Sequence, residues 1–266
     1  MNVTMVSAPA RTDRVNEDFT GAIPAAAVLI DGAGIPGAES TCRHGVAWYA
    51  RRLGGTLLGL LSLPQSLPGI LAEAITQVTD AHRDTCDVTN PISPSAAVAI
   101  LRVSGDHLDH LVLGDALVLL DRTGAPPLVS TDPREVTVSR TYEPLLEATT
   151  PGGDEHHRIL HALRANRNRT GGFWVAKDDP RAAEEAITGR YPVADLSAAA
   201  LLSNGAGRIV DRFDLTDWPG VLAALASNGP GDIIDRVRQA EAHHSIRPDD
   251  ATIAYCTNFS THQQAL

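Results

Sequence analysis

Aromatic residues, lysine and cysteine are scarce in this sequence. Phe, Trp and Tyr together make up 4% of the 266 residues, so short aliphatic side chains must supply most of the core. Lys177 is the only lysine. The three cysteines, Cys42, Cys86 and Cys256, cannot form a closed set of disulfides, and we therefore expect the protein to work in a reducing compartment.

Long apolar runs are also absent. No stretch approaches the ~20 consecutive apolar residues that a membrane-spanning helix needs. The first residues do not contain the charged region and apolar stretch of a secretory signal. We therefore expect a soluble, cytoplasmic protein with no membrane partner. The formal net charge of -10 argues against a nucleic-acid partner, because phosphate backbones attract basic surfaces, but it is compatible with a site that concentrates divalent cations.

The remaining composition is typical of a globular protein. Hydrophobic residues make up 43% and charged residues 20% of the chain, with no internal repeat or low-complexity linker, which predicts a single domain over residues 1–266. Short apolar runs predict strands and helical spacing predicts helices. The expected strands are residues 25–30, 96–103, 108–113, 116–121, 135–139, 173–176, 198–202 and 251–256. The expected helices are residues 39–61, 67–82, 155–164, 181–188, 218–227 and 233–244.

Two segments have a more specific expected shape. The three strands between residues 96 and 121 are expected to form an antiparallel meander, and Asp115 fits a tight turn in which the acid bonds its own backbone. Residues 151–172 are polar and bounded by glycine pairs, which predicts an inserted flap element. The histidines and arginines of the flap are typical of a solvated surface, and the alternative is a flap that contacts a substrate phosphate or a partner.

Polar residues stand beside a predicted strand end in four separate segments. The segments are Asn16-Glu17-Asp18, Asp31-Gly32, Asn204-Gly205 and Asp249-Asp250. Magnesium and manganese prefer oxygen ligands of this kind, and a backbone carbonyl beside a glycine can complete the coordination shell. Each segment alone is equally typical of an ordinary turn.

The order of these segments carries more information than any one of them. The series VNEDF, AVLIDGAG, SAAVAILRV with LVLGDALVLL, LLSNGAG and PDDATIAYC resembles the ordered motifs of the protein phosphatase 2C family, a family of metal-dependent serine/threonine phosphatases. The resemblance extends from about residue 14 to residue 256. It implies an α+β fold, a four-layer αββα sandwich of two antiparallel sheets flanked by helices, with a two-metal site at one edge.

The resemblance also implies roles for individual residues. Asp31 would bridge two Mn²⁺ or Mg²⁺ ions, the carbonyl of Gly32 would bind one of them, and Asp249 would bind the second. Asp18 would hold metal-bound water. A water activated by two ions can attack phosphorus directly, so the implied reaction is hydrolysis of phosphoserine or phosphothreonine in a phosphoprotein without a nucleophilic side chain.

The sequence departs from the family pattern at two places. Asn204 stands where the family has a third metal-binding aspartate, so the second ion should bind more weakly, and Asp250 is a possible accessory ligand that restores charge. The phosphate-binding arginine of the family falls on Asp13, which makes the neighbouring Arg14 our candidate for that catalytic role. Arg11 also flanks this position.

Three alternatives stay open. The chain is either a phosphatase, with activity reduced by Asn204, or a catalytically impaired pseudophosphatase that binds a phosphoprotein or a cognate kinase as a regulator. An unrelated α/β binding module would require the motif matches to be accidental.

A second group of possible metal ligands contains cysteine and histidine. Cys42 and His44 stand near the start of one expected helix, and His82 and Cys86 stand near the end of the next. If the two helices pair antiparallel, the four side chains could converge as zinc ligands. The alternative is that they are buried thiols and helix-end histidines.

Overall fold

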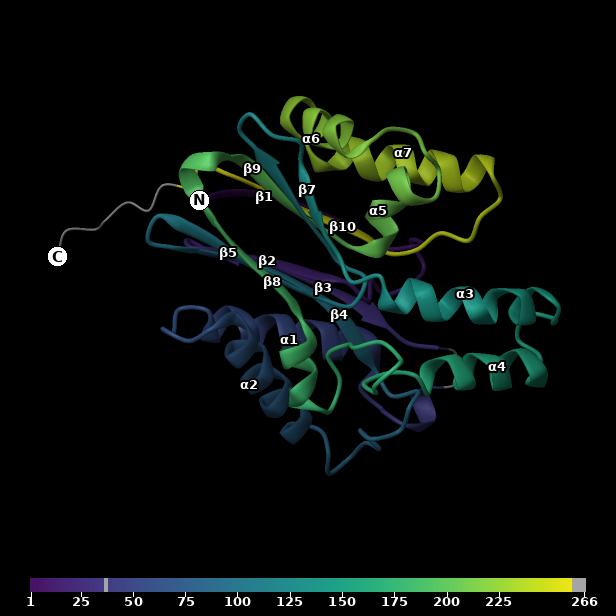
Figure 1. Cartoon of the computed structure of the whole chain (residues 1–266). Helices are drawn as coiled ribbons and strands as arrows, with labels where there is room; N and C mark the ends of the chain where they lie inside the picture. The colour runs from purple at the N-terminus through teal and green to yellow at the C-terminus, as the bar shows by residue number, and fades with distance from the viewer. Residues whose placement is uncertain (36–37, 260–266) are drawn as a thin grey trace.

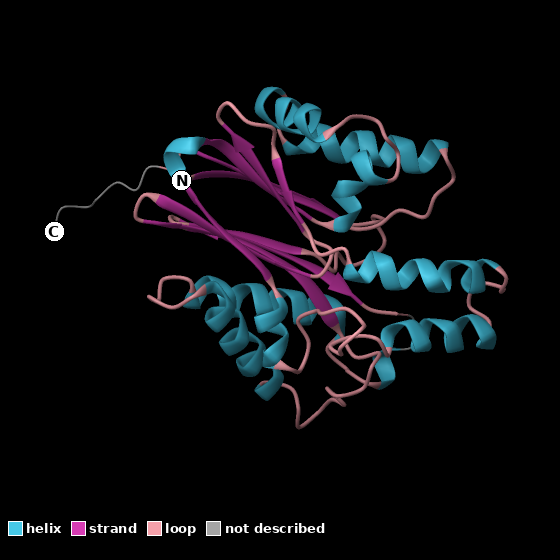
Figure 2. Cartoon of the chain, viewed as in Figure 1, coloured by secondary structure: helices cyan, strands magenta, loops and turns pink. Residues whose placement is uncertain are grey.

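The computed structural model describes residues 1–35 and 38–259 of the chain. Two five-stranded antiparallel sheets lie face to face, and helices cover the outer face of each sheet (Figures 1 and 2). The expected αββα sandwich of two antiparallel sheets flanked by helices is therefore confirmed. Among the described helices, none combines the length and the apolar character needed to cross a membrane.

One sheet has the strand order β2-β3-β4-β5-β8 and carries two helices. Its strands are β2 (Phe19–Ile23), β3 (Ala26–Ala33), β4 (Ser95–Ser104), β5 (His107–Leu113) and β8 (Ile187–Pro192). The covering helices are α1 (Gly45–Leu60) and α2 (Leu67–Asp80), which lie below this sheet in Figure 1. Ser66 caps α2, because its hydroxyl accepts a hydrogen bond from the backbone N–H of Gly69.

The other sheet has the strand order β1-β10-β9-β6-β7 and carries three helices. Its strands are β1 (Asn2–Ala8), β10 (Ala251–Thr257), β9 (Leu196–Leu202), β6 (Leu117–Arg122) and β7 (Leu128–Ser130). The helices are α5 (Asn204–Asp211), α6 (Trp218–Ser227) and α7 (Pro230–His243). A short 3-10 helix, η3 (Val193–Asp195), joins β8 of one sheet to β9 of the other.

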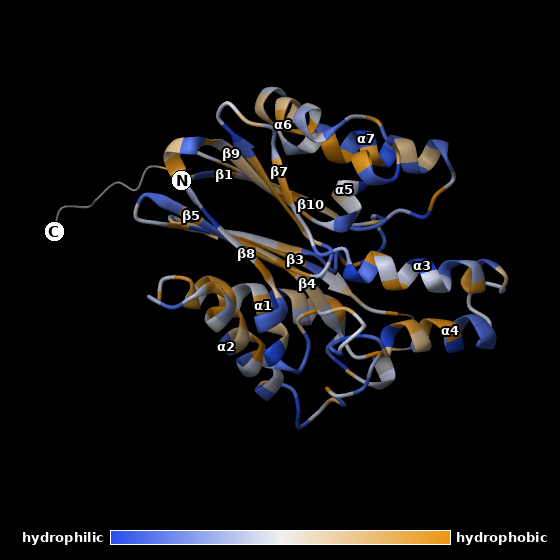
Figure 3. Cartoon of the chain, in the orientation of Figure 1, coloured by the Kyte–Doolittle hydropathy of each residue, from blue (hydrophilic) through white to orange (hydrophobic). Residues whose placement is uncertain are grey.

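The core occupies three layers, and β3 shows how the sequence divides between them. Val28 and Ile30 pack among the buried residues of α1 and α2, whereas Ala27 and Leu29 face the opposite sheet. Both faces of the strand are therefore buried, which explains why the sequence reads as a continuous apolar run rather than an alternating one. Apolar colouring accordingly follows the central strands and the inner sides of the helices (Figure 3).

Helices α3 (Arg134–Glu147) and α4 (Asp154–Arg164) form a pair that projects beyond the edge of the sandwich (Figure 1). The strand expected over residues 135–139 is wrong, because these residues belong to α3. Val138 and Tyr142, four residues apart on one helical face, pack against a buried cluster that includes Leu163 and Phe173. The projecting element thus begins at Arg134, before the expected flap boundary of residue 151.

Other expectations fail where the chain changes sheet. The meander is wrong, because β5 pairs with β4 and β8, whereas β6 pairs with β7 and β9 in the other sheet. The expected helix over 181–188 is a 3-10 helix, η2 (Pro180–Glu185), followed by the edge strand β8. Residues 173–176 make isolated bridges only. The expected strand ranges did not include the edge strands β1, β2, β7 and β8, because edge strands expose much of their length and need few apolar residues.

Two adjacent glycines of α1 offer a matched test of the packing. A Cβ at Gly54 would collide with the ring of Phe19, whereas a Cβ at Gly55 would meet nothing within 4 Å. We expect Gly55→Ala to raise the free energy of unfolding by about 0.5–1 kcal/mol through helix propensity. Gly54→Ala should lower it by about 1–3 kcal/mol through overpacking. Urea denaturation of both variants checks this, and equal effects at the two positions would contradict the packing.

Candidate metal centre

Two aspartates face each other across the β2-β3 ladder. Phe19, the first residue of β2, pairs with Ile30, so Asp18 directly before β2 lies near Asp31 of β3, and its charge raises the pKa of Asp31. The approach to β2 is fixed locally, because the side-chain oxygen of Asn16 accepts a hydrogen bond from the backbone N–H of Asp18 at 2.9 Å. The ladder therefore places the two carboxylates at the same end of the sheet.

Gly32 lets the chain leading into β2 approach β3 closely. A Cβ at this position would overlap the backbone carbonyl of Glu17 and lie 2.7 Å from the Val46 side chain of α1. No other residue type fits here without displacing backbone. The Asp-Gly pair recognised in the sequence thus has a steric reason, because glycine keeps the Asp31 region in contact with the segment that carries Asp18.

Asn204 connects this edge to the second sheet. The residue starts α5 directly after β9, and its backbone N–H donates to Asp31 Oδ2 at 2.8 Å. Its side-chain Nδ2 donates to Asp115 Oδ2, also at 2.8 Å. The amide oxygen is the atom that remains for an ion. Asp115 lies where the chain crosses from β5 to β6. Its carboxylate accepts a hydrogen bond from the distant Asn204 and also one from its own backbone N–H in the turn.

Asp249 and Asp250 precede β10 but have different partners. Asp249 Oδ2 forms an ion pair of 2.6 Å with Arg208 of α5, and Asp249 Oδ1 accepts the backbone N–H of Asp250 at 3.1 Å. Arg208 in turn pairs at 2.7 Å with Glu241, a buried carboxylate of α7. A fixed positive charge therefore already sits against one predicted metal ligand.

The carboxylate of Asp250 holds the N-terminal loop in place. Its two oxygens accept backbone N–H groups of Ala10 and Glu17, each at 2.6 Å. These bonds join the start of β10 to the loop that delivers Asp18. The predicted accessory metal role would require Asp250 to share oxygens that already have backbone partners.

The carboxylates of the centre are buried close to one another, and this favours a bound cation or a proton. Asp18 is buried, and neither of its carboxylate oxygens has a hydrogen-bond partner of normal geometry among the described residues. Burial raises the pKa of Asp18 to about 7, the carboxylates of Asp250 and Asp249 act in the same direction, and the hydroxyls of Thr252 and Ser203 oppose it. Buried charge that lacks partners is costly unless a cation or a proton neutralises it.

Asp31 and Asp115 experience the same crowding. Burial raises the pKa of Asp31 well above its usual value, and the charges of Asp18, Asp115 and Asp249 add to the effect. Burial also raises the pKa of Asp115 to about 7, with Glu135 contributing. Carboxylate and amide oxygens are the ligands that a hard divalent ion such as Mn²⁺ or Mg²⁺ prefers, so these crowded acids and Asn204 suit such an ion.

The candidate phosphate-binding arginine lies outside this centre. Residues 11–14 form an exposed turn closed by a bond from the N–H of Arg14 to the carbonyl of Arg11, rather than a continuation of a strand. Arg11 pairs with Asp13 at 2.7 Å. Arg14 is exposed, and no described contact joins its guanidinium to the carboxylates. Its catalytic role stays a prediction.

Arginines that the sequence did not single out lie beside the centre. An open pocket of about 610 Å³ is lined by Val15 and Glu17 of the loop before β2 and by Trp48, Arg51 and Arg52 of α1. Both arginines are exposed, and neither has an ion-pair partner within the described part of the chain. Only the three-dimensional packing of α1 against the β2 loop could identify them, because their spacing within the helix is unremarkable in the sequence.

Two arginines at and just after the end of α4 are more buried than the solvated surface expected for them. Arg164 pairs at 2.9 Å with Glu135 of α3. Arg167 is buried and donates to the backbone carbonyls of Pro91, Ser93 and Ala33 at 3.4–3.5 Å. Burial lowers the pKa of Arg167 well below its usual value. The expected solvated patch is therefore wrong for these two residues. Arg164 instead ties α4 to α3, and Arg167 attaches the segment after α4 to the end of β3.

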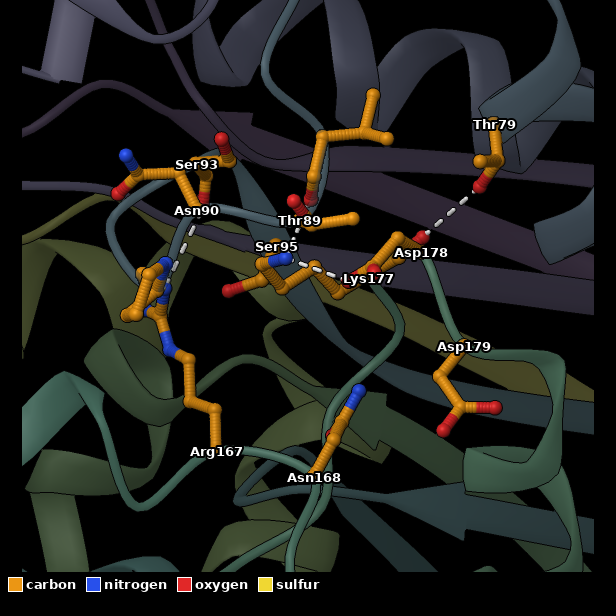
Figure 4. Close-up of polar contacts among 12 residues, drawn as sticks. Thr79, Thr89, Asn90, Ser93, Ser95, Arg167, Asn168, Lys177, Asp178 and Asp179 are labelled. Atoms are coloured by element: carbon orange, nitrogen blue, oxygen red, sulfur yellow. Dashed lines mark hydrogen bonds and ion pairs between the residues drawn. The ribbon is translucent and has the colours of Figure 1, made fainter. Parts of the chain in front are cut away.

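Lys177 anchors the next part of the same segment. Its Nζ contacts Asp178 Oδ1 and the carbonyl of Val88, both at 2.5 Å. Its own carbonyl accepts hydrogen bonds from the hydroxyls of Tyr49 and Thr79, and Figure 4 shows Lys177 with Asp178 and Thr79. These bonds hold the chain after the helix pair against α1 and α2. The only lysine of the protein is thus a buried structural residue.

The cysteines and histidines named in the sequence meet elsewhere, at the start of α1. Cys42, His44 and Cys86 lie together, whereas His82 bonds the carbonyl of Val78 through Nδ1 at 2.7 Å. None of these four side chains has a described hydrogen bond to the carboxylates of the candidate centre.

This chain is similar to known proteins in its structure, whereas no protein-family model and no curated protein matches its sequence. A bacterial serine phosphatase aligns over 98% of this chain and 99% of its own, with a TM-score of 0.62 and 12% identity. Serine/threonine phosphatase Stp1 from Staphylococcus aureus covers 96% of this chain and 94% of its own, with a TM-score of 0.60 and 14% identity.

A third similar structure contains metal. It is the catalytic domain of the serine/threonine protein phosphatase PstP in complex with two manganese ions, and it covers 96% of both chains with a TM-score of 0.56 and 16% identity. At these identities the likeness shows the fold. The match nevertheless extends over nearly the whole chain, as the ordered motifs did.

The Asn204–Asp115 hydrogen bond leads to a stability prediction for the metal-free protein. Asn204→Asp would replace a donor with a second carboxylate opposite Asp115, so we expect the free energy of unfolding to fall by about 1–3 kcal/mol at neutral pH. Asn204→Ala removes the same bond without adding charge and should cost about 1 kcal/mol. Urea denaturation in the presence of chelator compares the two, and a more stable Asn204→Asp variant would exclude the repulsion.

Proposed function

Because the chain has the fold of bacterial serine/threonine phosphatases of the protein phosphatase 2C type, we propose that it is a metal-dependent phosphatase acting on phosphoserine or phosphothreonine in a phosphoprotein. The observation that carries the proposal is the buried carboxylate of Asp18, without a hydrogen-bond partner of normal geometry and opposite Asp31. A purely structural aspartate would be expected to form well-aligned hydrogen bonds, whereas the nearby hydroxyls of Thr252 and Ser203 lower the pKa of Asp18 without bonding its oxygens in normal geometry.

The proposed centre would hold two Mn²⁺ or Mg²⁺ ions. Asp31 would be the ligand shared by both ions, the Gly32 carbonyl and Asn204 Oδ1 would contribute neutral oxygens, and Asp249 would serve the second ion. Bound ions would lower the pKa of a water and so supply a hydroxide for attack on phosphorus at neutral pH. Asp18, whose buried carboxylate oxygens have no hydrogen-bond partner of normal geometry, would orient that water.

The two ions are expected to differ in affinity. Asp31 faces Asp18 and Asp115, neither of which has an ion-pair partner among the described residues, whereas Asp249 is already paired with Arg208 at 2.6 Å and Asn204 contributes no charge. An ion bound by Asp249 would have to compete with the guanidinium. We therefore propose one stronger and one weaker ion site.

Substrate phosphate is the proposed occupant of the pocket beside the centre. Arg51 and Arg52 offer two exposed positive charges near the loop that carries Asp18, and guanidinium groups bind phosphate oxygens through paired hydrogen bonds. This supports a phosphorylated ligand on a chain whose net charge is -10. The same pocket could present a phosphoprotein to a centre without turnover.

A regulator is the second candidate function. The features that favour it are Asn204, which removes a charge from the centre, and the Arg208–Asp249 ion pair, which occupies a metal ligand. In that case the chain would bind a phosphoprotein or its cognate kinase without hydrolysis. The two functions differ in turnover, so they can be separated by measurement.

Activity measurements with a phosphothreonine peptide test the metal mechanism. We expect Mn²⁺-dependent turnover in the wild type, and a drop in kcat/KM of about 1000-fold in Asp31→Asn, equal to about 4 kcal/mol of transition-state stabilisation. Asn204→Asp should tighten the weaker Mn²⁺ site about ten-fold in calorimetric titration. Asp235→Asn, the same change at an exposed position of α7, is the matched control and should leave both quantities unchanged.

The outcomes separate the two functions. Full activity in Asp31→Asn would contradict the metal mechanism. A silent wild type together with turnover in Asn204→Asp would favour the regulator. Silence in both, with no Mn²⁺ bound, would contradict the phosphatase proposal.

The pocket arginines give a separate prediction. Arg51→Gln and Arg52→Gln should each raise KM for the phosphopeptide by about five- to ten-fold, because one phosphate contact is worth about 1 kcal/mol or more, with little change in kcat. Arg212→Gln, an exposed arginine of the opposite sheet's helical layer, is the control. Unchanged KM in both pocket variants would remove this pocket from substrate binding.

A further inference from the structure

Three metal-ligating side chains converge where α1 begins. Cys86 Sγ lies 3.2 Å from Cys42 Sγ and 3.3 Å from His44 Nδ1, and Cys42 Sγ lies 3.9 Å from the same nitrogen. Cys42 and His44 precede α1, whereas Cys86 follows α2. The antiparallel pairing of the helices brings these segments together, and the N–H of Asp87 donates to the carbonyl of Thr41 at 2.8 Å.

We propose that Cys42, His44 and Cys86 form a binding site for a thiophilic divalent cation, Zn²⁺. Zinc lies about 2.3 Å from sulfur and about 2.0–2.1 Å from nitrogen in tetrahedral sites, which separates the ligand atoms by about 3.5–3.8 Å. The three separations of 3.2–3.9 Å bracket that range. Thiolate and imidazole ligands select zinc over the hard cations that suit the carboxylate centre.

The surroundings of His44 fix the position of its ring. The ring stacks on Trp48, one turn further along α1, with centroids 4.4 Å apart and an angle of 27° between the planes. This contact keeps Nδ1 directed toward the two sulfur atoms. Cys42 is buried, whereas His44 and Cys86 are partly exposed, so an ion can reach the site from solvent.

A water molecule completes the proposed coordination. His82 is buried nearby, with its ring centroid 6.1 Å from that of His44, but its ring nitrogens do not belong to the cluster of ligand atoms and its Nδ1 bonds the carbonyl of Val78 at 2.7 Å. The zinc would join the start of α1 to the segment after α2.

A disulfide between Cys42 and Cys86 is the competing explanation. It would leave the approach of His44 Nδ1 to both sulfur atoms without a role, whereas zinc uses all three side chains. The zinc site shares no ligand with the carboxylate centre, so zinc binding can be tested without the proposed phosphatase function, although His44 also lines the pocket beside that centre.

Metal analysis of the full-length protein tests the proposal. Protein expressed with zinc and purified under reducing conditions should retain about one zinc per chain. Titration of the zinc-depleted protein with Co²⁺ should produce a thiolate-to-cobalt charge-transfer band, which oxygen ligands cannot give. Cys42→Ser and Cys86→Ser should each weaken zinc binding by about 100-fold or more and abolish the band. Removing zinc should lower the thermal unfolding midpoint of the wild type.

Two variants control for other sites. Cys256→Ser changes a buried cysteine of β10, and Asp31→Asn disrupts the carboxylate centre, so both should keep the zinc and the cobalt band. Loss of zinc in Asp31→Asn together with retention in Cys86→Ser would overturn the proposal. Absence of zinc and of the cobalt band in the wild type, or a Cys42–Cys86 disulfide in the reduced preparation detected by mass spectrometry, would overturn it as well.

Discussion

The hydrogen bond from the backbone of Asn204 to Asp31 joins the two sheets at the edge where the carboxylates meet. Asp31 belongs to β3 of one sheet, and Asn204 follows β9 of the other. On each side a second acid extends the contact, since Asp18 stands beside Asp31 and Asp250 ties the loop before β2 to the start of β10. The arrangement concentrates negative charge at the edge where the two sheets are joined. A cation bound there would therefore stabilise the contact between the sheets.

The sequence predicted the parts of this centre that are local in the chain. Asp31 and Asn204 could be identified because each ends an apolar run at a glycine, and the ordered motifs indicated that such strand ends meet. The partners of these residues could not be predicted. The pairing of Arg208 with Asp249 and the bonds of Asp250 to Ala10 and Glu17 join positions 41, 240 and 233 residues apart, and no local pattern encodes them.

The same distinction applies to the fold. The central strands β3, β4 and β9 were predictable because burial on both faces demands apolar residues throughout. The edge strand β1 and the helix α3 were not, since the first needs few apolar residues and the second has an alternating start that also fits a strand. What decides α3 is the contact of Val138 and Tyr142 with the buried cluster around Phe173, which is a tertiary constraint.

The pairing of β1 with β10 has a consequence for how the protein is made. Asn2 pairs with Thr257 and Ala8 with Ala251, so β1 cannot gain its neighbour in the sheet until β10, about 240 residues later in the chain, has been synthesised. On the ribosome, the segment carrying Asp18 and Asp31 emerges long before Asn204 and Asp249. A nascent or truncated chain therefore cannot assemble the carboxylate cluster, and such contacts between distant segments form slowly. The proposed metal site can therefore form only in chains whose synthesis has passed β10.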